Sequence, residues 1–496
     1  MKRNFKKIIC SLICTSVILT LLSMTVSANS AQTHWSGVDS TGAIVVGESC
    51  PIEVTKEVLT LDALELPTNH YGTVEEYLTY TGKVTAEYTF YNPTDLTVTA
   101  TLAFPFGTQP DYARLKYDNA TYSYISADTE KYGITVNGEA VDKEIRYTLN
   151  PSGGSFKLSN DLPRLSDIYI EDDFYSPVMT VTKYTYIVGG ENKEGQIDEV
   201  KYRAVDAAFD WDGGDGKTRI YCPHQSGFYR QKDGGGKFGA MVDNGDILVV
   251  YAIGNPISAP LEWNCYECGD VEDGKEIEGI VSLINTETMT LEDLALEKWN
   301  EDTGVSKVDW YNAVIAAFTE GGKGYAEYNY IGNFYYGSYT STEKFASSLM
   351  RWYQYEIMIE PKTSITNTVT APIYPEIDAR YRPAIYNYTY LLSPASTWAS
   401  FGELEIVINT PFYITDNTID GFTKTDNGYT YKQNGLPSSE LEFTLCTDKN
   451  PTYRSYGGVL INGIRIETLI FIAAIVVVAF VGVAVFVVRR KKNTGN

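Results

Sequence analysis

Apolar and polar residues alternate along "EYTFYNPTDLTVTATLAFPFG", residues 87–107. The positions that share one face are Val84, Ala86, Tyr88 and Phe90 before the turn and Leu96, Val98, Ala100, Leu102 and Phe104 after it. A period of two is typical of strands that bury one face. "NPTD" has turn chemistry, and Pro105 removes a backbone donor at the end of the second arm. The pattern predicts an antiparallel β-hairpin.

The same alternation recurs along the chain. "ITVNGEAV" carries Asn137-Gly138 between two short strands, which is a strong local signal for a hairpin. Further predicted strands are "TVTKYTYIVGG", "DILVVYAIG", "EIEGIVSLI", "YEIMIEP", "NYTYLLSP", "GELEIVINTPFYI" and "LEFTLCT". We therefore predict a mainly β protein built from antiparallel β-sandwich domains.

One region has a helical period instead. In "GVSKVDWYNAVIAAFTEGG", Ser306 and Asp309 have the spacing of an N-cap pair, and Gly321-Gly322 would end the helix. The apolar positions at helical spacing are Val308, Tyr311, Ile315 and Phe318. A second helix is expected over 291–300, after Thr290. The pattern predicts a small helical insertion that covers a sheet or separates two β-domains.

The two ends of the chain predict its location. Residues 1–28 combine four basic residues, an apolar run and a small-residue site ending at Ala28, as a secretory signal peptide does. Residues 469–488 are twenty uncharged residues, enough to cross a bilayer as a helix, and "RRKK" follows directly. We therefore expect a single-pass protein of the cell membrane with its N-terminus extracytoplasmic and residues 489–496 in the cytoplasm.

The external part is too long for one ordinary core. We predict an N-terminal β-rich domain over 29–284, a helix-containing segment over 285–365 and a C-terminal β-domain over 366–465. The boundaries near Ile284 and Thr366 are chosen where the pattern changes.

The external part is also strongly acidic. Setting aside the eight basic residues of the two ends leaves 32 Lys and Arg against 63 Asp and Glu, a net charge of −31. This charge disfavours nucleic acid and anionic membrane surfaces as partners. It suits cations, neutral sugars or basic protein surfaces.

Five cysteines remain after the signal peptide, at Cys50, Cys222, Cys265, Cys268 and Cys446. An odd number cannot all pair within one chain, so the pattern leaves any disulfide open. "CYEC" (265–268) is half of a zinc knuckle without a second half at knuckle spacing, and it lacks the βαβ context of a redox motif. An incidental pair in a strand or turn is the favoured interpretation.

A candidate cation site lies in "DWDGGDGKT", residues 210–218. The segment fails as a phosphate loop, because its first glycine would fall at Trp211 and a strand, not a helix, follows. Asp210, Asp212 and Asp215 place three carboxylates in six residues, as a calcium loop needs, but EF-hand spacing is absent. A solvated turn between strands is therefore the favoured interpretation, and a calcium site is the alternative. No other cofactor is predicted.

Two further features bear on function. Residues 325–345, "YAEYNYIGNFYYGSYTSTEKF", are dense in tyrosines that could stack on sugars or on a protein partner, or could pair across strands. The three histidines, His34, His70 and His224, belong to no catalytic pattern. Carboxylates are too numerous for a glycosidase-type pair to be selected.

Several blocks carry a resemblance. They include "YNPTDLTVTATLAFPFG", "DLPRLSDIYIEDDFYSPVMTVTKYTYIV", "LMRWYQYEI" and "YTYLLSPASTWASFGELEIVINTPFY". They resemble a family of uncharacterised Firmicutes (Gram-positive) surface proteins with one C-terminal transmembrane helix, over nearly the whole mature chain. The family implies location and architecture but no activity. The "YNPTD…FP" pattern is also similar to the vault/inter-alpha-trypsin (VIT) β-domain, without the metal motif of that domain's adhesion partner.

Together these features predict a membrane-anchored extracytoplasmic protein that binds or scaffolds at the bacterial cell envelope without catalysis. Its partner, whether cell-wall polymer or protein, is not specified by the sequence. The alternatives are an envelope hydrolase acting on cell-wall glycan or peptide, and an accessory subunit of a membrane complex.

Overall fold

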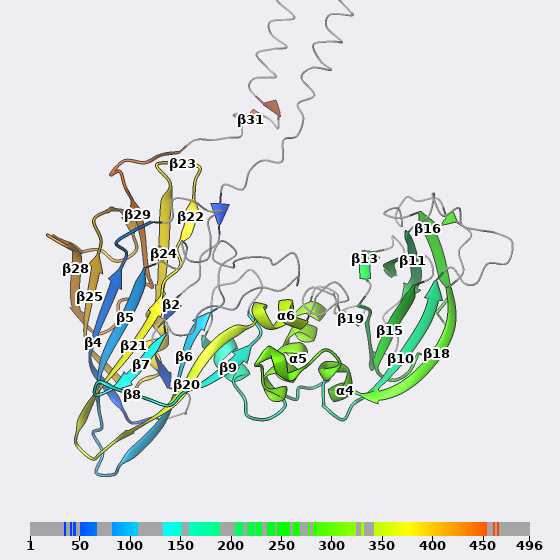
Figure 1. Cartoon of the computed structure of the whole chain (residues 1–496), viewed down its shortest axis with the longest axis horizontal. Coiled ribbons are helices and arrows are strands. Elements are labelled where there is room, and N and C mark those ends of the chain that lie inside the picture. Colours follow the sequence, from blue (N-terminus) through cyan, green and yellow to red (C-terminus); the bar gives the residue numbers. More distant parts are fainter. Residues whose placement is uncertain are drawn as a thin grey trace, which may run out of the picture.

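The computed structural model describes part of the chain and is mainly β, with several antiparallel sheets. The described residues are 34–35, 40–41, 43–45, 50–66, 82–107, 132–150, 158–188, 204–211, 216–223, 225–230, 236–243, 246–257, 261–267, 276–277, 281–323, 329–331, 342–453, 460–461 and 464–465. In Figure 1 they form a large β-sandwich, a helical layer and a second β-sandwich.

The first sandwich contains one broad sheet. Its eight strands, in spatial order, are β27 (Thr423–Thr425), β28 (Gly428–Asn434), β25 (Ser400–Asn409), β4 (Glu53–Asp62), β5 (Lys83–Tyr91), β21 (Ser364–Pro372), β7 (Gly133–Val136) and β8 (Glu139–Ala140). Neighbours are antiparallel except β4 and β25, which run parallel.

Two smaller sheets share a core with the broad sheet. One contains β1 (His34–Trp35), β22 (Glu376–Asp378), β24 (Ile385–Leu391), β29 (Leu441–Cys446) and β26 (Tyr413–Asn417), with β2 (Ser40–Thr41) beside β24. The other contains β3 (Ile44–Val45), β6 (Val98–Gly107), β20 (Met350–Ile359) and β9 (Glu144–Thr148). The 3-10 helix η5 (Ser393–Thr397) and the short ladder of β23 (Tyr381–Arg382) with β30 (Thr452–Tyr453) complete this part. A separate two-stranded ladder joins β31 (Leu460–Ile461) and β32 (Ile464–Arg465).

The predicted apolar face of residues 84–104 is confirmed except at Leu96, which is 75% exposed, but the hairpin is wrong. Phe90 and Leu102 are fully buried, whereas Thr99 is exposed. However, β5 pairs with β4 and β21, while β6 pairs with β20 and β3. "NPTD" therefore turns the chain from one sheet of the sandwich to the facing sheet. Period-two alternation defines which face is buried but does not identify the neighbouring strand.

The hairpin at Asn137-Gly138 is confirmed. β7 and β8 pair antiparallel, and both turn residues have positive φ, 50° and 85°. This is the backbone that an Asn-Gly turn favours.

The helical layer contains α4 (Leu291–Leu296), η3 (Glu301–Thr303), α5 (Lys307–Lys323) and α6 (Thr342–Ser348). The short α3 (Leu158–Asp161) continues into η2 (Leu162–Arg164), where Leu162 packs against the first sandwich and Arg164 pairs with Glu320 of α5. The α5 N-cap is confirmed, because the Asp309 backbone N–H donates to Ser306 Oγ at 3.0 Å. Helix α4 begins after Thr290 as predicted, with a capping box between Thr290 and Asp293. It ends at Leu296, before the predicted end, and α5 runs through Gly321-Gly322 to Lys323.

The second sandwich packs two five-stranded sheets. One contains β18 (Val281–Thr290), β10 (Thr180–Val188), β15 (Ile247–Gly254), β12 (Thr218–Tyr221) and β19 (Tyr330–Ile331). The other contains β13 (Gln225–Arg230), β14 (Gly236–Asp243), β11 (Ala204–Trp211), β16 (Trp263–Glu267) and β17 (Glu276–Ile277). Alternate residues of β15 serve two cores: Leu248 and Val250 pack toward the facing sheet, and Tyr251 and Ile253 pack with the helices.

The domain boundaries need correction. Position 284 lies inside β18 and position 366 inside β21, so neither is a linker. Strands from the predicted N-terminal and C-terminal domains share the first sandwich, with β4 beside β25 and β5 beside β21. The chain leaves this sandwich after β9 and returns in β20, which pairs with β9. The second sandwich and the helices are thus an insertion between two adjacent strands.

Among the described residues, no helix has the length and apolar character needed to cross a bilayer. The predicted signal peptide (1–28), span (469–488) and cytoplasmic tail (489–496) all lie outside the described residues.

Candidate functional site

The predicted calcium ligands are only partly placed. Asp210 is an exposed residue near the end of β11, whereas Asp212 and Asp215 lie outside the described residues. Within the part of the chain that is described, no group of three His, Cys, Asp or Glu side chains could hold a metal ion. The calcium site stays a prediction.

The other sequence candidates are also partly placed. Cys265 is buried in β16, opposite Ala207 of β11, and Cys268 lies outside the described residues. The described residues also leave out most of the tyrosine-rich segment 325–345 and the side chains of all three histidines. From that segment, Phe345 packs edge-on against Trp310, with ring centroids 5.0 Å apart, and so belongs to the core of the helical layer.

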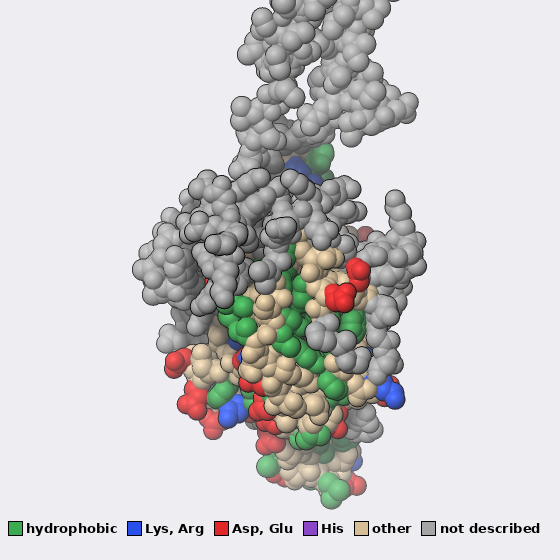
Figure 2. All heavy atoms as spheres, turned by 90° about the vertical axis from the view of Figure 1, so that its right-hand side faces the viewer, with side chains coloured by type: hydrophobic (Ala, Val, Ile, Leu, Met, Phe, Trp, Pro, Cys, Tyr) green, Lys and Arg blue, Asp and Glu red, His purple; other side chains and the backbone are tan. Residues whose placement is uncertain are grey.

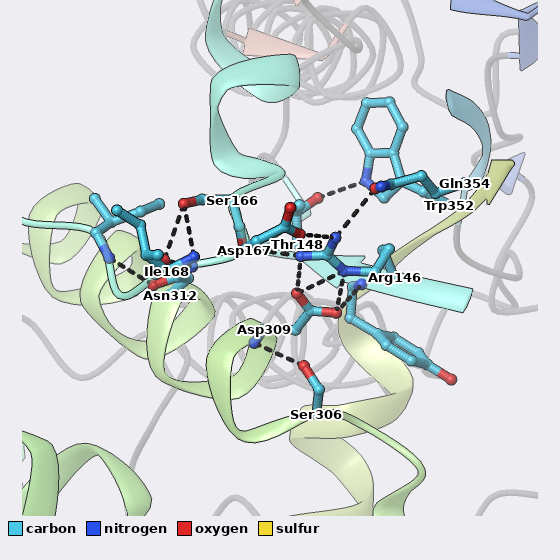
Figure 3. A network of polar contacts seen from close by, with 12 residues as sticks. Arg146, Thr148, Ser166, Asp167, Ile168, Ser306, Asp309, Asn312, Trp352 and Gln354 are labelled. Carbon is cyan, nitrogen blue, oxygen red and sulfur yellow. Dashed lines mark hydrogen bonds and ion pairs between the residues drawn. The ribbon is translucent and has the colours of Figure 1, made fainter. Parts of the chain in front are cut away.

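A buried ion pair, which the sequence did not reveal, joins the first sandwich to the helical layer (Figure 3). Arg146 on β9 and Asp309 in the first turn of α5 are both almost inaccessible to solvent. Arg146 Nε lies 3.1 Å from both carboxylate oxygens of Asp309, and Nη2 lies 2.9 Å from Oδ1. This geometry holds the planar guanidinium against the carboxylate at two points.

The remaining donors of Arg146 are also engaged. Nη1 donates to Asp167 Oδ1 at 2.7 Å and to Gln354 Oε1 at 3.0 Å. Nη2 also donates to the Ser166 carbonyl at 2.8 Å. Because every guanidinium nitrogen has protein acceptors, this cluster has no donor left for a ligand and acts as a structural junction.

Neighbouring contacts extend the junction along segment 166–170 and α5. The Tyr147 backbone N–H donates to Asp309 Oδ2 at 3.0 Å. Asn312, one turn further along α5, accepts from the Ile170 N–H and donates to the Ile168 carbonyl, at 2.8 and 3.0 Å. On the sandwich side, Trp352 Nε1 donates to Thr148 Oγ1 at 2.8 Å. Segment 166–170 is therefore fastened between β9 and α5 (Figure 3).

A second buried ionisable group lies in the core of the first sandwich. Glu57 on β4 is 1% exposed, beside the buried Tyr88 and Tyr390. Burial raises the pKa of its carboxyl from 4.5 to about 7, although the two tyrosine hydroxyls act to lower it. One carboxyl oxygen, Oε1, has no hydrogen-bond partner within the described structure. The group is sealed from solvent, so it can affect stability but cannot meet a substrate in this structure.

The second sandwich presents a different kind of surface. β18 is ten residues long, and its six residues from position 283 to position 288 are exposed. Leu283 is 42% exposed and Ile284 54% exposed. Figure 2 looks onto this side of the molecule and shows hydrophobic side chains over the middle of its described part, with Asp, Glu, Lys and Arg side chains mainly around them. Such a surface fits contact with another macromolecule.

Comparison with known proteins adds little. No protein-family model and no curated protein matches the chain. A crystal structure of a Legionella pneumophila protein described as a "putative nutrient binding protein" aligns with 84% of this chain and 72% of its own, at 10% identity and a TM-score of 0.28. A TM-score this low carries no argument about fold or function. The resemblances to Firmicutes surface proteins and to the VIT β-domain stay predictions.

Proposed function

We propose that the protein is a membrane-anchored, extracytoplasmic surface protein that binds or scaffolds at the bacterial cell envelope without catalysis. The basic and apolar start, the uncharged run at 469–488 and the "RRKK" after it support the location. The β-rich body, with loops and strand edges on its surface, suits a binding role.

The observation that carries the proposal is how the buried ionisable groups are used. Arg146 and Asp309 saturate each other and their neighbours, and Glu57 is enclosed among tyrosines. A hydrolase needs an acid or base that reaches both solvent and substrate. In the described residues, the carboxyl with the raised pKa is enclosed and the open surface around β18 is largely uncharged, as a binding face would be.

The location is tested by protease treatment of intact protoplasts carrying the full chain with a C-terminal epitope. We expect the ectodomain to be digested while the epitope stays protected. A matched variant lacking 469–488 should be released into the medium. A chain that is wholly protected, or a deletion variant that stays with the membrane, would refute the anchored topology.

Binding is tested with the detergent-purified full chain immobilised and exposed to separated cell-wall polymers and membrane proteins. We expect saturable retention of one component with no change in its mass. Adding the same chain free in solution should compete for that component and reduce its retention. Cleavage of wall glycan or peptide by the purified chain would instead establish the envelope hydrolase. Retention that requires the native residues 469–488 would favour an accessory subunit of a membrane complex.

A further inference from the structure

The edge of the second sandwich formed by β18 differs from the other described sheet edges. β18 has ten residues and pairs, among the described strands, with β10 alone. The outermost strands of the other large sheets, and β19 at the opposite edge of this sheet, span two to six residues each. A strand edge exposes unpaired backbone N–H and C=O groups, so a long edge is a template for another strand.

β18 also lacks the usual protection of an edge. Its sequence, "VSLINTETMT", has no lysine and no proline, and its single charged residue is Glu287. Lys183 Nζ lies 3.5 Å from a Glu287 carboxylate oxygen and 3.2 Å from one of Glu297. The pairing with β10 shifts once, at Ile284, and is regular from Asn285 to Thr290. The regular part therefore presents a nearly neutral, threonine-rich edge.

The chemistry of this edge matches a second copy of itself. In an antiparallel pair centred on Thr286, Glu287 faces Asn285 of the other copy, so the two carboxylates do not meet. Threonine then faces threonine at the axis, which is a favourable cross-strand pair. The net charge of −23 opposes association at long range, but salt screens it beyond about 8 Å at physiological ionic strength.

We propose that two copies of this chain associate edge to edge through antiparallel pairing of β18, joining their five-stranded sheets into one continuous sheet. The contact is isologous, as in most homodimers. It goes beyond the proposed binding role and holds whatever that role's ligand is. A basic segment of another protein is the competing occupant, and salt separates the two: screening strengthens contact between acidic copies and weakens contact with a basic partner.

The test is sedimentation equilibrium of the detergent-purified full chain at low and high salt. We expect a monomer–dimer equilibrium that shifts toward dimer as salt rises. Thr286→Lys, which brings two like charges together near the axis, should weaken dimerisation about tenfold or more. Thr99→Lys is the matched control, because it makes the same change at an exposed threonine of β6, and it should dimerise as the unsubstituted chain does.

The design excludes simpler explanations. Thr286→Lys lowers the net negative charge, so general repulsion cannot account for a weaker dimer. Equal melting temperatures for both variants would exclude unfolding. A second variant, Thr286→Cys, should form a disulfide-linked dimer in the native membrane, and Thr99→Cys should not. A chain that is monomeric at every salt concentration, or a Thr286→Lys dimer as strong as that of Thr99→Lys, would overturn the proposal.

Discussion

Glu57 makes the stability of the first sandwich depend on pH. Burial raises the pKa of its carboxyl from 4.5 to about 7, so the folded chain holds a proton that the unfolded chain loses at lower pH. The resulting stability is complete below about pH 4.5 and is lost as pH rises through about 7. A shift of this size corresponds to about 3 kcal/mol. We expect the unfolding free energy of the wild type, relative to Glu57→Gln, to fall by that amount between pH 4 and pH 8, measured by denaturant titration.

Glu405 supplies a control of opposite sign. A hydrogen bond from Lys432 is the main cause that lowers the pKa of its carboxyl, with a salt bridge of 2.9 Å. Its contribution is therefore present above the unfolded pKa and lost as pH falls. The wild type relative to Glu405→Gln should gain stability as pH rises. If both differences changed in the same direction, the buried position of Glu57 would be wrong.

The alternating faces of β5 and β6 give a second residue-scale prediction. Phe90 packs against Trp398 with ring centroids 4.4 Å apart, and Leu102 is fully buried. Phe90→Asp or Leu102→Asp should cost about 4 kcal/mol or more, because each buries a carboxylate without a partner. Thr99→Asp, on the exposed face, should cost less than about 1 kcal/mol. Thermal unfolding checks all three, and equal losses would show that the assigned face is wrong.

The two cases show what local pattern can reveal. Phe90 and Leu102 follow an unbroken period of two, so their burial could be predicted. Glu57 could not, because the register of β4 against β5 shifts between Val54 and Lys56. This irregularity puts Val54 and Glu57 on the same buried side, three positions apart. A bulge is set by neighbouring strands, which periodicity within one strand does not report.

At the scale of elements, Asn92 fastens two connections between the sheets of the first sandwich. Its side-chain Nδ2 donates to the carbonyls of Leu96 and Ile359 at 2.7 and 2.9 Å. Its Oδ1 accepts from the Thr94 N–H at 2.9 Å. The first connection joins β5 to β6, and Ile359 ends β20 just before the second connection, from β20 to β21. One fully buried amide thus holds both crossings in register.

Replacing Asn92 tests whether its side-chain amide holds these two connections, which together form the corner between the two sheets. Asn92→Ala removes the buried amide that donates to the Leu96 and Ile359 carbonyls and should lower the unfolding free energy by about 3 kcal/mol. Asn434→Ala removes an exposed amide at the end of β28 and should change stability by less than about 0.5 kcal/mol. Denaturant titration of both variants is the measurement. A loss below about 1 kcal/mol for Asn92→Ala would contradict the corner's role.

The corner also shows why an element could be predicted but not its neighbour. Asn92, Pro93 and Asp95 indicate a turn, and a turn is present. Whether the two arms pair or separate depends on β20 and β21, more than 250 residues later. The Asn137-Gly138 hairpin could be predicted completely, because a two-residue turn with positive φ leaves its strands no other arrangement.

At the scale of the whole molecule, the chain is a sandwich interrupted by a long insertion. Thr148 of β9 faces Met350 of β20, so the ends of the insertion are neighbours. Nothing in the local pattern near position 149 or 349 marks this arrangement, because adjacent strand ends become apparent only after the sheet has formed. The predicted helices of the insertion depended on capping and spacing within a few residues, and they were found.

The Arg146–Asp309 junction predicts how the insertion is coupled to the first sandwich. Arg146→Lys keeps the charge but cannot reproduce a planar group that reaches Asp309, Asp167 and Ser166 together. We expect it to lower the unfolding free energy by about 3 kcal/mol or more, since it leaves buried acceptors unpaired. Asp95→Asn, which breaks the exposed pair with Lys362, should cost less than about 1 kcal/mol.

A double-mutant cycle separates the pair from the folding of either partner. If the two side chains act together, Asp309→Asn in the Arg146→Lys background should cost much less than in the wild type, with a coupling of about 1 to 3 kcal/mol. Hydrogen exchange gives a second measurement: Arg146→Lys should speed exchange in segment 166–170 and the first turn of α5, while β4 and β25 keep their protection. Additive costs, or faster exchange throughout the first sandwich, would mean that Arg146 supports its own sheet rather than the attachment of the insertion.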